Sequence, residues 1–209
     1  TYHHWKSALL PTISACLPIS RAPTTEYATL GPWRQLTGCP TGEAMATPEV
    51  DGIVITHGTD TQEETAYFLN LVVKSDKPVV LTGSMRPSTA LSADGPLNMY
   101  NAVAIAASPK AKGYGVMVLM NDDIHSAHDV KKMITTPVHT FESPLEGLLG
   151  TCIFGEVEFF HKPFGRHTVD SEFSIDGVKE LPRVDIVYTC ADVSADLIDI
   201  MVNAGAKGI

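Results

Sequence analysis

The sequence of 209 residues lacks three features that would each define a class of protein. Its four cysteines form no CxxC pair and have no histidines at ligand spacing, so neither a zinc site nor a disulfide framework is predicted, and no metal ligands are assigned. No apolar run approaches the roughly 20 residues that cross a bilayer, so no membrane-spanning segment is predicted. Positive charge is also scarce. With 15 lysines and arginines against 24 acids, the net charge is −9, and a nucleic-acid partner is not expected.

Little regular structure is expected in the first 50 residues. This stretch holds six of the 14 prolines, which interrupt every window in which a helix or a central strand could run. A signal-peptide interpretation of residues 6–16 is weak, because the basic region is thin and Pro11 breaks the apolar part. Composition therefore sets residues 1–50 apart as an atypical proline-rich segment.

From Asp51 onward the sequence alternates between strand and helix patterns. Short β-branched apolar runs alternate with segments in which apolar residues recur at helical spacing. Because each strand is nearly continuously apolar and the connections are long enough for helices, a parallel sheet is expected. The predicted fold class is α/β, a doubly wound, mostly parallel sheet with helices on both faces. Strands are predicted at 52–56, 78–82 and 116–120, and helices at 61–74 and 96–107.

The pattern loosens after residue 120. Residues 154–160 predict part of a hairpin around Gly155, residues 183–188 a further parallel strand, and residues 194–203 a helix. Another strand starts at residues 208–209, where the chain ends. The sequence therefore predicts the truncated start of a second, smaller α/β domain.

The loops at the carboxyl ends of the strands are where ligands bind in an open parallel sheet. In the first loop Gly58 is expected to allow a tight turn, while Thr59 and Asp60 place a hydroxyl beside a carboxylate at a helix N-terminus. The alternative is purely structural: Thr59 or Asp60 caps the helix, and Glu63 or the next glutamate completes a capping box. Spacing alone leaves both interpretations open.

Two further segments carry polar side chains. The loop at 83–95 contains an acid and a base, as loops around binding sites do, but a plain crossover in which Arg86 pairs with a surface carboxylate is the alternative. The segment at 121–133 offers His125 and His128. This pair lacks the HExxH arrangement, so two exposed polar histidines are expected rather than a metal site.

Two lysines, Lys131 and Lys132, close the second of these segments. A desolvated amine beside a hydroxyl can take the hydroxyl proton and so create a nucleophile, which a solvated lysine does not do. Spacing does not choose between the two lysines, and two solvated side chains are the alternative.

Taken together, these segments resemble the bacterial-type L-asparaginases, in particular the secreted high-affinity class that includes the glutaminase-asparaginases. The similarity is carried by DGIVITHGTDTQEETAYFL at 51–69, GSMRPS at 83–88, SADGPLNMYNAV at 92–103 and DVKK at 129–132. It covers about residues 46–209. The first of these motifs is long and specific.

The resemblance implies a hydrolase, an amidohydrolase that converts asparagine, and in some members glutamine, to the acid and ammonia without a metal or organic cofactor. It assigns catalysis to Thr59 and Lys132, since the family lysine is the second one of the DVKK motif. It assigns substrate binding to Gly58, Asp60 and Ser84. It also implies a small-molecule substrate as partner, a homotetramer, and a periplasmic or secreted location, with the cytoplasm as the alternative.

Two parts of the family are expected to be missing. Residues 1–50 contain no TGGTIA-like motif, whose threonine is generally regarded as the primary nucleophile, and nearly all of the smaller C-terminal domain is absent. We therefore expect an incomplete N-terminal-type α/β domain over residues 51–180, followed over 181–209 by a linker and the start of the C-terminal-type domain. The hypothesis for residues 1–50 is a truncated or frame-shifted reading frame, or an unrelated segment joined on.

Two other functions compete with the amidohydrolase. The first is a non-catalytic remnant of the family that retains at most weak amino-acid binding, because loss of a primary nucleophile removes most of the rate acceleration. The second is a nucleotide-binding domain. The sequence has neither GxGxxG nor GxxxxGK[ST] after a predicted strand, which disfavours the second function.

Overall fold

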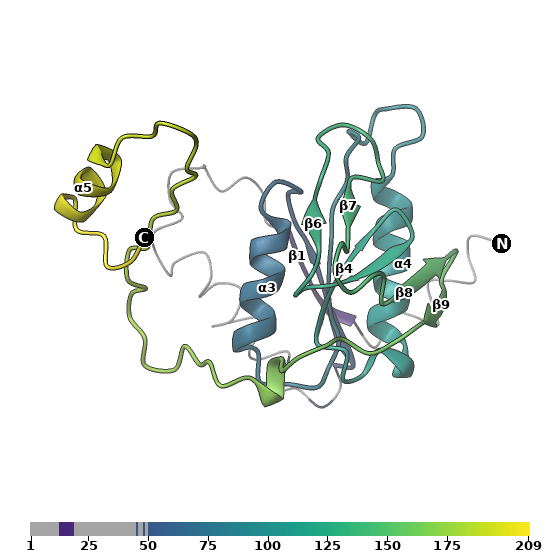
Figure 1. Ribbon diagram of the computed structural model, residues 1–209. Helices are drawn as coiled ribbons and strands as arrows, with labels where there is room; N and C mark the ends of the chain where they lie inside the picture. Colours follow the sequence, from purple (N-terminus) through teal and green to yellow (C-terminus); the bar gives the residue numbers. More distant parts are fainter. Residues whose placement is uncertain (1–12, 19–44, 46–47, 49) are drawn as a thin grey trace.

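The computed structural model describes residues 13–18, 45, 48 and 50–209 (Figure 1). Its strands form a mixed seven-stranded sheet in the order β1-β2-β3-β4-β5-β8-β9 and a separate two-stranded sheet of β6 and β7. The strands are β1 (Ile13–Pro18), β2 (Gly52–Thr56), β3 (Val79–Thr82), β4 (Val116–Met120), β5 (Asp123–Ser126), β6 (Lys131–Lys132), β7 (Phe141–Glu142), β8 (Gly150–Ile153) and β9 (Glu156–Phe159). The helices are α3 (Gln62–Val72), α4 (Gly95–Ala107) and α5 (Asp196–Asn203), with short 3-10 turns η1 (Pro109–Ala111) and η2 (Thr168–Asp170).

The predicted alternation of strand and helix is confirmed from β2 to β4. These three strands pair in parallel, with α3 and α4 as the connections. Thr56, the last residue of β2, lies opposite Thr82, the last residue of β3. The polar loops that begin at His57 and Gly83 therefore leave the same edge of the sheet side by side.

Beyond β4 the sheet is antiparallel, so it is mixed rather than mostly parallel as predicted. Asn121 and Asp122 adopt left-handed backbone conformations, with φ of 52° and 68°, and turn the chain directly back from β4 into β5. The predicted polar loop at 121–133 is thus a strand in its first part. The hydrophobic pattern of the sequence did not predict β5, because three of its four residues, in the sequence DIHS, are polar. The last three of these residues are nevertheless buried.

The seven-stranded sheet separates two apolar cores. Side chains alternate along β2, so Ile53 and Ile55 join the core under α3 while Val54 joins the core under α4. The two helices flank the sheet in Figure 1, and helices on both faces are thereby confirmed. At the start of β2 the α4 layer lies so close that a Cβ on Gly52 would collide with the carbonyl oxygen of Ala106.

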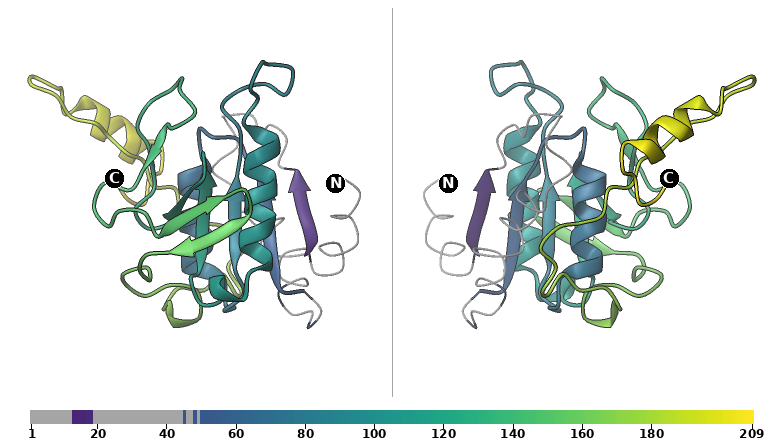
Figure 2. Two further views of the ribbon diagram at one scale, coloured as in Figure 1. Left: turned by 90° about the vertical axis from the view of Figure 1, so that its right-hand side faces the viewer. Right: turned by 90° about the vertical axis from the view of Figure 1, so that its left-hand side faces the viewer.

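Strand β1 lies at the edge of the sheet, in parallel with β2 (Figure 2). A strand here departs from the scarcity of regular structure expected before residue 50. An edge position nevertheless suits its sequence, because Pro18 at its end lacks the N–H group that a central strand needs. The rest of that expectation falls almost entirely on residues outside the described part of the chain.

Predictions for the last third of the chain have mixed outcomes. The hairpin around Gly155 is confirmed as β8 and β9, and the helix as α5, none of whose side chains is buried. The predicted strand at 183–188 is wrong: in the described structure Val184 forms only an isolated bridge, to Gly208, and a strand needs a partner along its length. In Figure 1 α5 lies away from the sheet. Among the described helices, none has the length and apolar character that crossing a bilayer requires.

Candidate active site

Lys132, Thr59 and Asp60 meet at the carboxyl edge of the parallel strands. The Lys132 Nζ lies 2.9 Å from Thr59 Oγ1 and 2.6 Å from Asp60 Oδ1. A hydroxyl, an amine and a carboxylate therefore converge at one point, although the lysine is 73 residues away from the threonine in sequence. Their catalytic and binding roles stay a prediction.

Two separate elements bring these groups together. Thr59 and Asp60 lie in the turn between β2 and α3, whereas Lys132 is the last residue of β6. Two buried side chains anchor β6. Val130 directly precedes β6 and Phe141 lies in its pairing partner β7, and both belong to the core under α3. Burial of these apolar side chains fixes the hairpin that presents the lysine.

Exposure differs sharply within the cluster. The Lys132 side chain is 13% exposed, whereas that of Asp60 is 92% exposed. An ion pair with so exposed a partner adds little stability, but it orients the amine and leaves the carboxylate accessible to a second cation. Lys131 is exposed. Neighbouring side chains on a strand point to opposite faces, which is why only one of the two lysines reaches the turn.

The capping alternative for this turn is wrong. The cap residue of α3 is Thr61, and no side-chain capping hydrogen bond is found there among the described residues. The Thr59 hydroxyl and the Asp60 carboxylate contact Lys132 instead. Glu63 does not close a capping box either: its Oε2 accepts a hydrogen bond from the backbone N–H of Lys132 at 2.5 Å.

Of the other two predicted binding residues, Gly58 precedes Thr59 in the same turn and Ser84 lies in the loop after the neighbouring strand β3. Gly58 has no positive φ, and a Cβ placed on it would meet nothing described within 4 Å. The expectation that the tight turn requires glycine at this position is therefore wrong. Ser84 is exposed and faces the start of α4, where a Cβ on Gly95 would lie 3.2 Å from its Cβ. Their roles in substrate binding stay predictions.

Gly83 packs closely against the turn that contains Thr59 and against Gln62, the first residue of α3. A Cβ on Gly83 would lie 3.2 Å from Thr59 Cγ2 and 3.2 Å from Gln62 Oε1. Gln62 is fully buried, and neither Nε2 nor Oε1 has a hydrogen-bond partner among the described residues. Sequence reasoning missed both residues, because close backbone packing leaves no signal in residue spacing.

His57 holds the turn at the end of β2, and sequence reasoning missed it too. Its Nδ1 donates to the carbonyl oxygen of Gly58 at 2.7 Å, and its Nε2 accepts from Thr65 Oγ1 at 2.8 Å. Burial lowers the pKa of His57, and the backbone hydrogen bond to Gly58 raises it less. The neutral ring fits both contacts. Its position between the strand end and Gly58 is the signal that could have identified it.

The loop after β3 is ordered by its own residues. The Asp94 carboxylate accepts hydrogen bonds from the backbone N–H groups of Met85 at 2.9 Å and Arg86 at 3.0 Å. The Arg86 guanidinium donates to the carbonyl oxygen of Ser92 at 2.8 Å. The surface ion pair considered for Arg86 is therefore replaced by a main-chain contact within the loop.

The histidine segment is also ordered by internal contacts. His125 is buried, so the expectation of two exposed histidines is wrong for it. Burial lowers its pKa to about 4, and the charge of Asp129 raises it less. His128 is exposed, as expected. The ring of His125 is held by Ser143 Oγ, 2.9 Å from its Nδ1.

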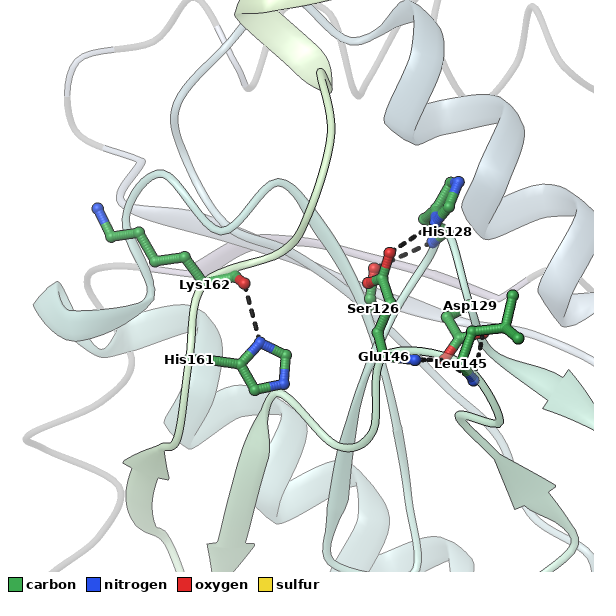
Figure 3. Close-up of polar contacts among 7 residues, drawn as sticks. All are labelled: Ser126, His128, Asp129, Leu145, Glu146, His161 and Lys162. Carbon is green, nitrogen blue, oxygen red and sulfur yellow. Dashed lines mark hydrogen bonds and ion pairs between the residues drawn. The ribbon is translucent and has the colours of Figure 1, made fainter.

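Figure 3 shows how the neighbouring acids organise this region. The Asp129 carboxylate accepts the backbone N–H groups of Leu145 and Glu146, while Glu146 Oε1 lies 2.8 Å from His128 Nδ1. These contacts tie the turn around Glu146 to the end of β5. Within the part of the chain that the structure describes, no three His, Cys, Asp or Glu side chains are grouped as a metal would require.

Comparisons with known proteins agree with the resemblance inferred from the motifs. The family described as "Asparaginase, N-terminal" matches residues 33–165, which begins before the expected onset near residue 46. L-asparaginase 2 of Bacillus subtilis (strain 168) is 56% identical over 165 residues, 79% of this chain and 44% of that protein. Glutaminase-asparaginase of Pseudomonas fluorescens biotype A is 55% identical over 167 residues, 80% of this chain and 46% of that protein.

A solved structure gives the same result. The probable cytoplasmic L-asparaginase from Campylobacter jejuni has a TM-score of 0.75 and 50% sequence identity, over 77% of this chain and 51% of that chain. The chain thus spans about half the length of the relatives it matches.

Proposed function

The chain belongs to the asparaginase family, and on that basis we propose that it is an L-asparaginase-type amidohydrolase, which releases ammonia from the side-chain amide of asparagine and, as a second substrate, glutamine. The contact of Lys132 Nζ with Thr59 Oγ1 at 2.9 Å is the observation that carries the proposal. The names of the relatives, L-asparaginase 2 and glutaminase-asparaginase, support this substrate class.

In the proposed reaction Lys132 first gives up the proton of its ammonium group to solvent; the Thr59 hydroxyl oxygen then attacks the carbonyl carbon of the substrate amide, and the Lys132 amine takes the hydroxyl proton. That proton passes to the departing nitrogen, and ammonia leaves. Water then hydrolyses the acyl-threonine ester, which releases the acid and restores the hydroxyl. Each step uses only protein side chains and water, so the proposal needs no cofactor.

Substrate binding is proposed for Asp60, Gly58 and Ser84. The Asp60 carboxylate would bind the ammonium group of the amino acid, and its 92% exposure supports access from solvent. Gly58 lies in the same turn, and Ser84 follows the neighbouring strand. All three lie in loops at the sheet edge where ligands collect in this class of fold.

Ammonia release from asparagine tests the proposed function. Thr59→Val and Lys132→Met are expected to lower the rate at least roughly 100-fold, as loss of a nucleophile or its base does. Lys131→Met is the matched control, because it removes the exposed neighbouring amine and should leave the rate unchanged. If the unaltered chain releases no more ammonia than the Thr59→Val/Lys132→Met double variant, the non-catalytic alternative replaces the enzyme.

The resemblance also leads us to propose a homotetramer and a periplasmic or secreted location. The name of the Campylobacter jejuni relative supports the cytoplasmic alternative for location. Light scattering after gel filtration tests the assembly: a tetramer has four times the 22.5 kDa mass of one chain. A monomeric peak at all concentrations would contradict it.

A further inference from the structure

Glu63 joins helix α3 to the strand that carries Lys132. Its Oε2 accepts the backbone N–H of Lys132 at 2.5 Å, across 69 residues of sequence. Glu63 lies in the first turn of α3, just after the turn that contains Thr59. One lysine is thus held at both ends, its main chain by Glu63 and its amine by Thr59 and Asp60.

The strand that presents Lys132 has little pairing of its own. β6 has two residues and pairs only with β7 within the described sheet. Successive N–H groups of a strand point to opposite sides, and the next one, from Met133, donates to the carbonyl oxygen of Thr140 at 2.8 Å. The N–H of Lys132 therefore points away from β7, and Glu63 is its acceptor. A carboxylate makes this hydrogen bond stronger than a neutral acceptor would.

We propose that Glu63 is a positioning residue, which fixes the main chain of Lys132 so that its amine reaches the Thr59 hydroxyl. The catalytic meaning of this inference rests on the proposed function. Glu63 does not touch the reacting groups and acts through Lys132. The consequence for rate follows from geometry, because a displacement of about 1 Å between reacting groups can lower a rate roughly 100-fold.

Glu63 also fits a simpler role as an acid in the first turn of a helix, where negative charge is stabilising. Glu64 provides the matched control for that role. It lies in the same turn with the same charge, but it is exposed. Partial burial of its carboxyl raises the pKa of Glu64, a hydrogen bond to its own backbone N–H lowers it less, and the charge of Glu63 raises it further. Glu64→Ala therefore removes a first-turn acid and leaves the contact with Lys132 intact.

The kinetic test compares three variants in the ammonia-release assay. Glu63→Ala is expected to lower kcat roughly 10- to 100-fold with KM within about threefold, because substrate contacts are unchanged. Glu63→Gln keeps an acceptor oxygen and should restore most of kcat. Glu64→Ala should leave kcat unchanged. Equal kcat in Glu63→Ala and Glu64→Ala would overturn the proposal, and so would a Glu63→Gln variant as slow as Glu63→Ala.

A second measurement decides the contact without any activity. Amide hydrogen exchange by NMR should be at least about tenfold faster at Lys132 in Glu63→Ala than in the unaltered chain or Glu64→Ala. The ε-carbon resonance of Lys132 should shift in Glu63→Ala alone. An inactive unaltered chain would overturn the proposed function only, whereas unchanged exchange at Lys132 in Glu63→Ala would overturn the positioning role, whatever the activity.

Discussion

A Cβ placed on Gly83 would lie 2.5 Å from the carbonyl oxygen of His57, a separation that side chains essentially never show. The two loops cannot move apart easily, because the N–H of His57 donates to the carbonyl oxygen of Thr82 at 2.8 Å. The turn that carries Thr59 therefore rests on the bare backbone of residue 83.

Replacement of this glycine should disturb both stability and site geometry. Gly83→Ala is expected to lower the free energy of unfolding by about 1–3 kcal/mol, as overpacking does. Urea denaturation measures the change. Gly58→Ala is the control, because a Cβ there meets nothing described within 4 Å, and its stability should equal or exceed that of the unaltered chain. Equal stability of the two variants would refute the close packing at residue 83.

Asp94 is predicted to hold the loop after β3 closed. Asp94→Ala leaves the N–H groups of Met85 and Arg86 without their acceptor and should lower the free energy of unfolding by about 1–3 kcal/mol. Asp76→Ala is the control: it breaks only a solvent-exposed ion pair with Lys112, worth roughly 0–1 kcal/mol. Similar losses in the two variants, measured in urea, would argue against this role for Asp94.

Asn101 should be among the least replaceable polar residues. Its fully buried amide donates to Asp122 Oδ1 at 2.8 Å and to the carbonyl oxygen of Cys152 at 2.7 Å, and accepts the N–H of Gly155 at 2.9 Å. Asn101→Leu leaves these three buried partners without their hydrogen bonds, so the free energy of unfolding should fall by about 2–4 kcal/mol. Thermal unfolding followed by circular dichroism measures this, with exposed Asn203→Leu as the control. A loss no greater than that of the control would contradict the prediction.

Acid should destabilise the fold through His125. Its pKa falls from an ordinary 6.5 to about 4 because of burial, with Asp129 opposing the shift. Between these pH values the unfolded chain binds a proton that the folded chain does not, so the free energy of unfolding decreases as the pH falls through this window. The contribution of neutral His125 to the free energy of unfolding is fully present above its ordinary pKa. It amounts to about 3 kcal/mol, because the fall of the pKa from 6.5 to about 4 is converted at roughly 1.36 kcal/mol per pH unit.

An NMR titration of the His125 ring checks the origin of this pH dependence. The ring resonance should keep its neutral position until the pH approaches the lower value. Urea denaturation of His125→Gln should show a shallower decline of stability between pH 6.5 and 4, where the ordinary and folded values bound the window. A His125 ring that titrates at its ordinary pKa would exclude it as the cause.

The first half of the site could be predicted from sequence because its determinants are local. The strand before Thr59 and the helix after it are encoded within some twenty residues by a β-branched run and a helical spacing. The partner of Thr59 was not encoded in this way. Spacing left Lys131 and Lys132 equivalent, and the resemblance selected the residue that the described hairpin turns inward.

What the sequence concealed is polar burial. His125 and Ser126 give β5 the hydropathy of a loop, yet both are buried, and the Ser143 hydroxyl forms a hydrogen bond with the His125 ring. The predicted strand at 183–188 failed for the opposite reason. It has the apolar residues of a strand, but the described structure gives it one pairing position, at Gly208.

The close approach of Gly52 to helix α4 restricts the register of β2 in the sheet. Both faces of β2 are apolar, so a register shift by one residue would exchange Val54 with Ile53 or Ile55 at little loss of buried area. Hydrophobic burial alone would therefore tolerate the wrong register. Such a slip would bring Asp51 or Ile53 against the Ala106 carbonyl, where only a hydrogen atom fits. The absence of a side chain at Gly52 thus fixes the alignment of β2, and with it the position of Thr59 relative to the loop that follows β3.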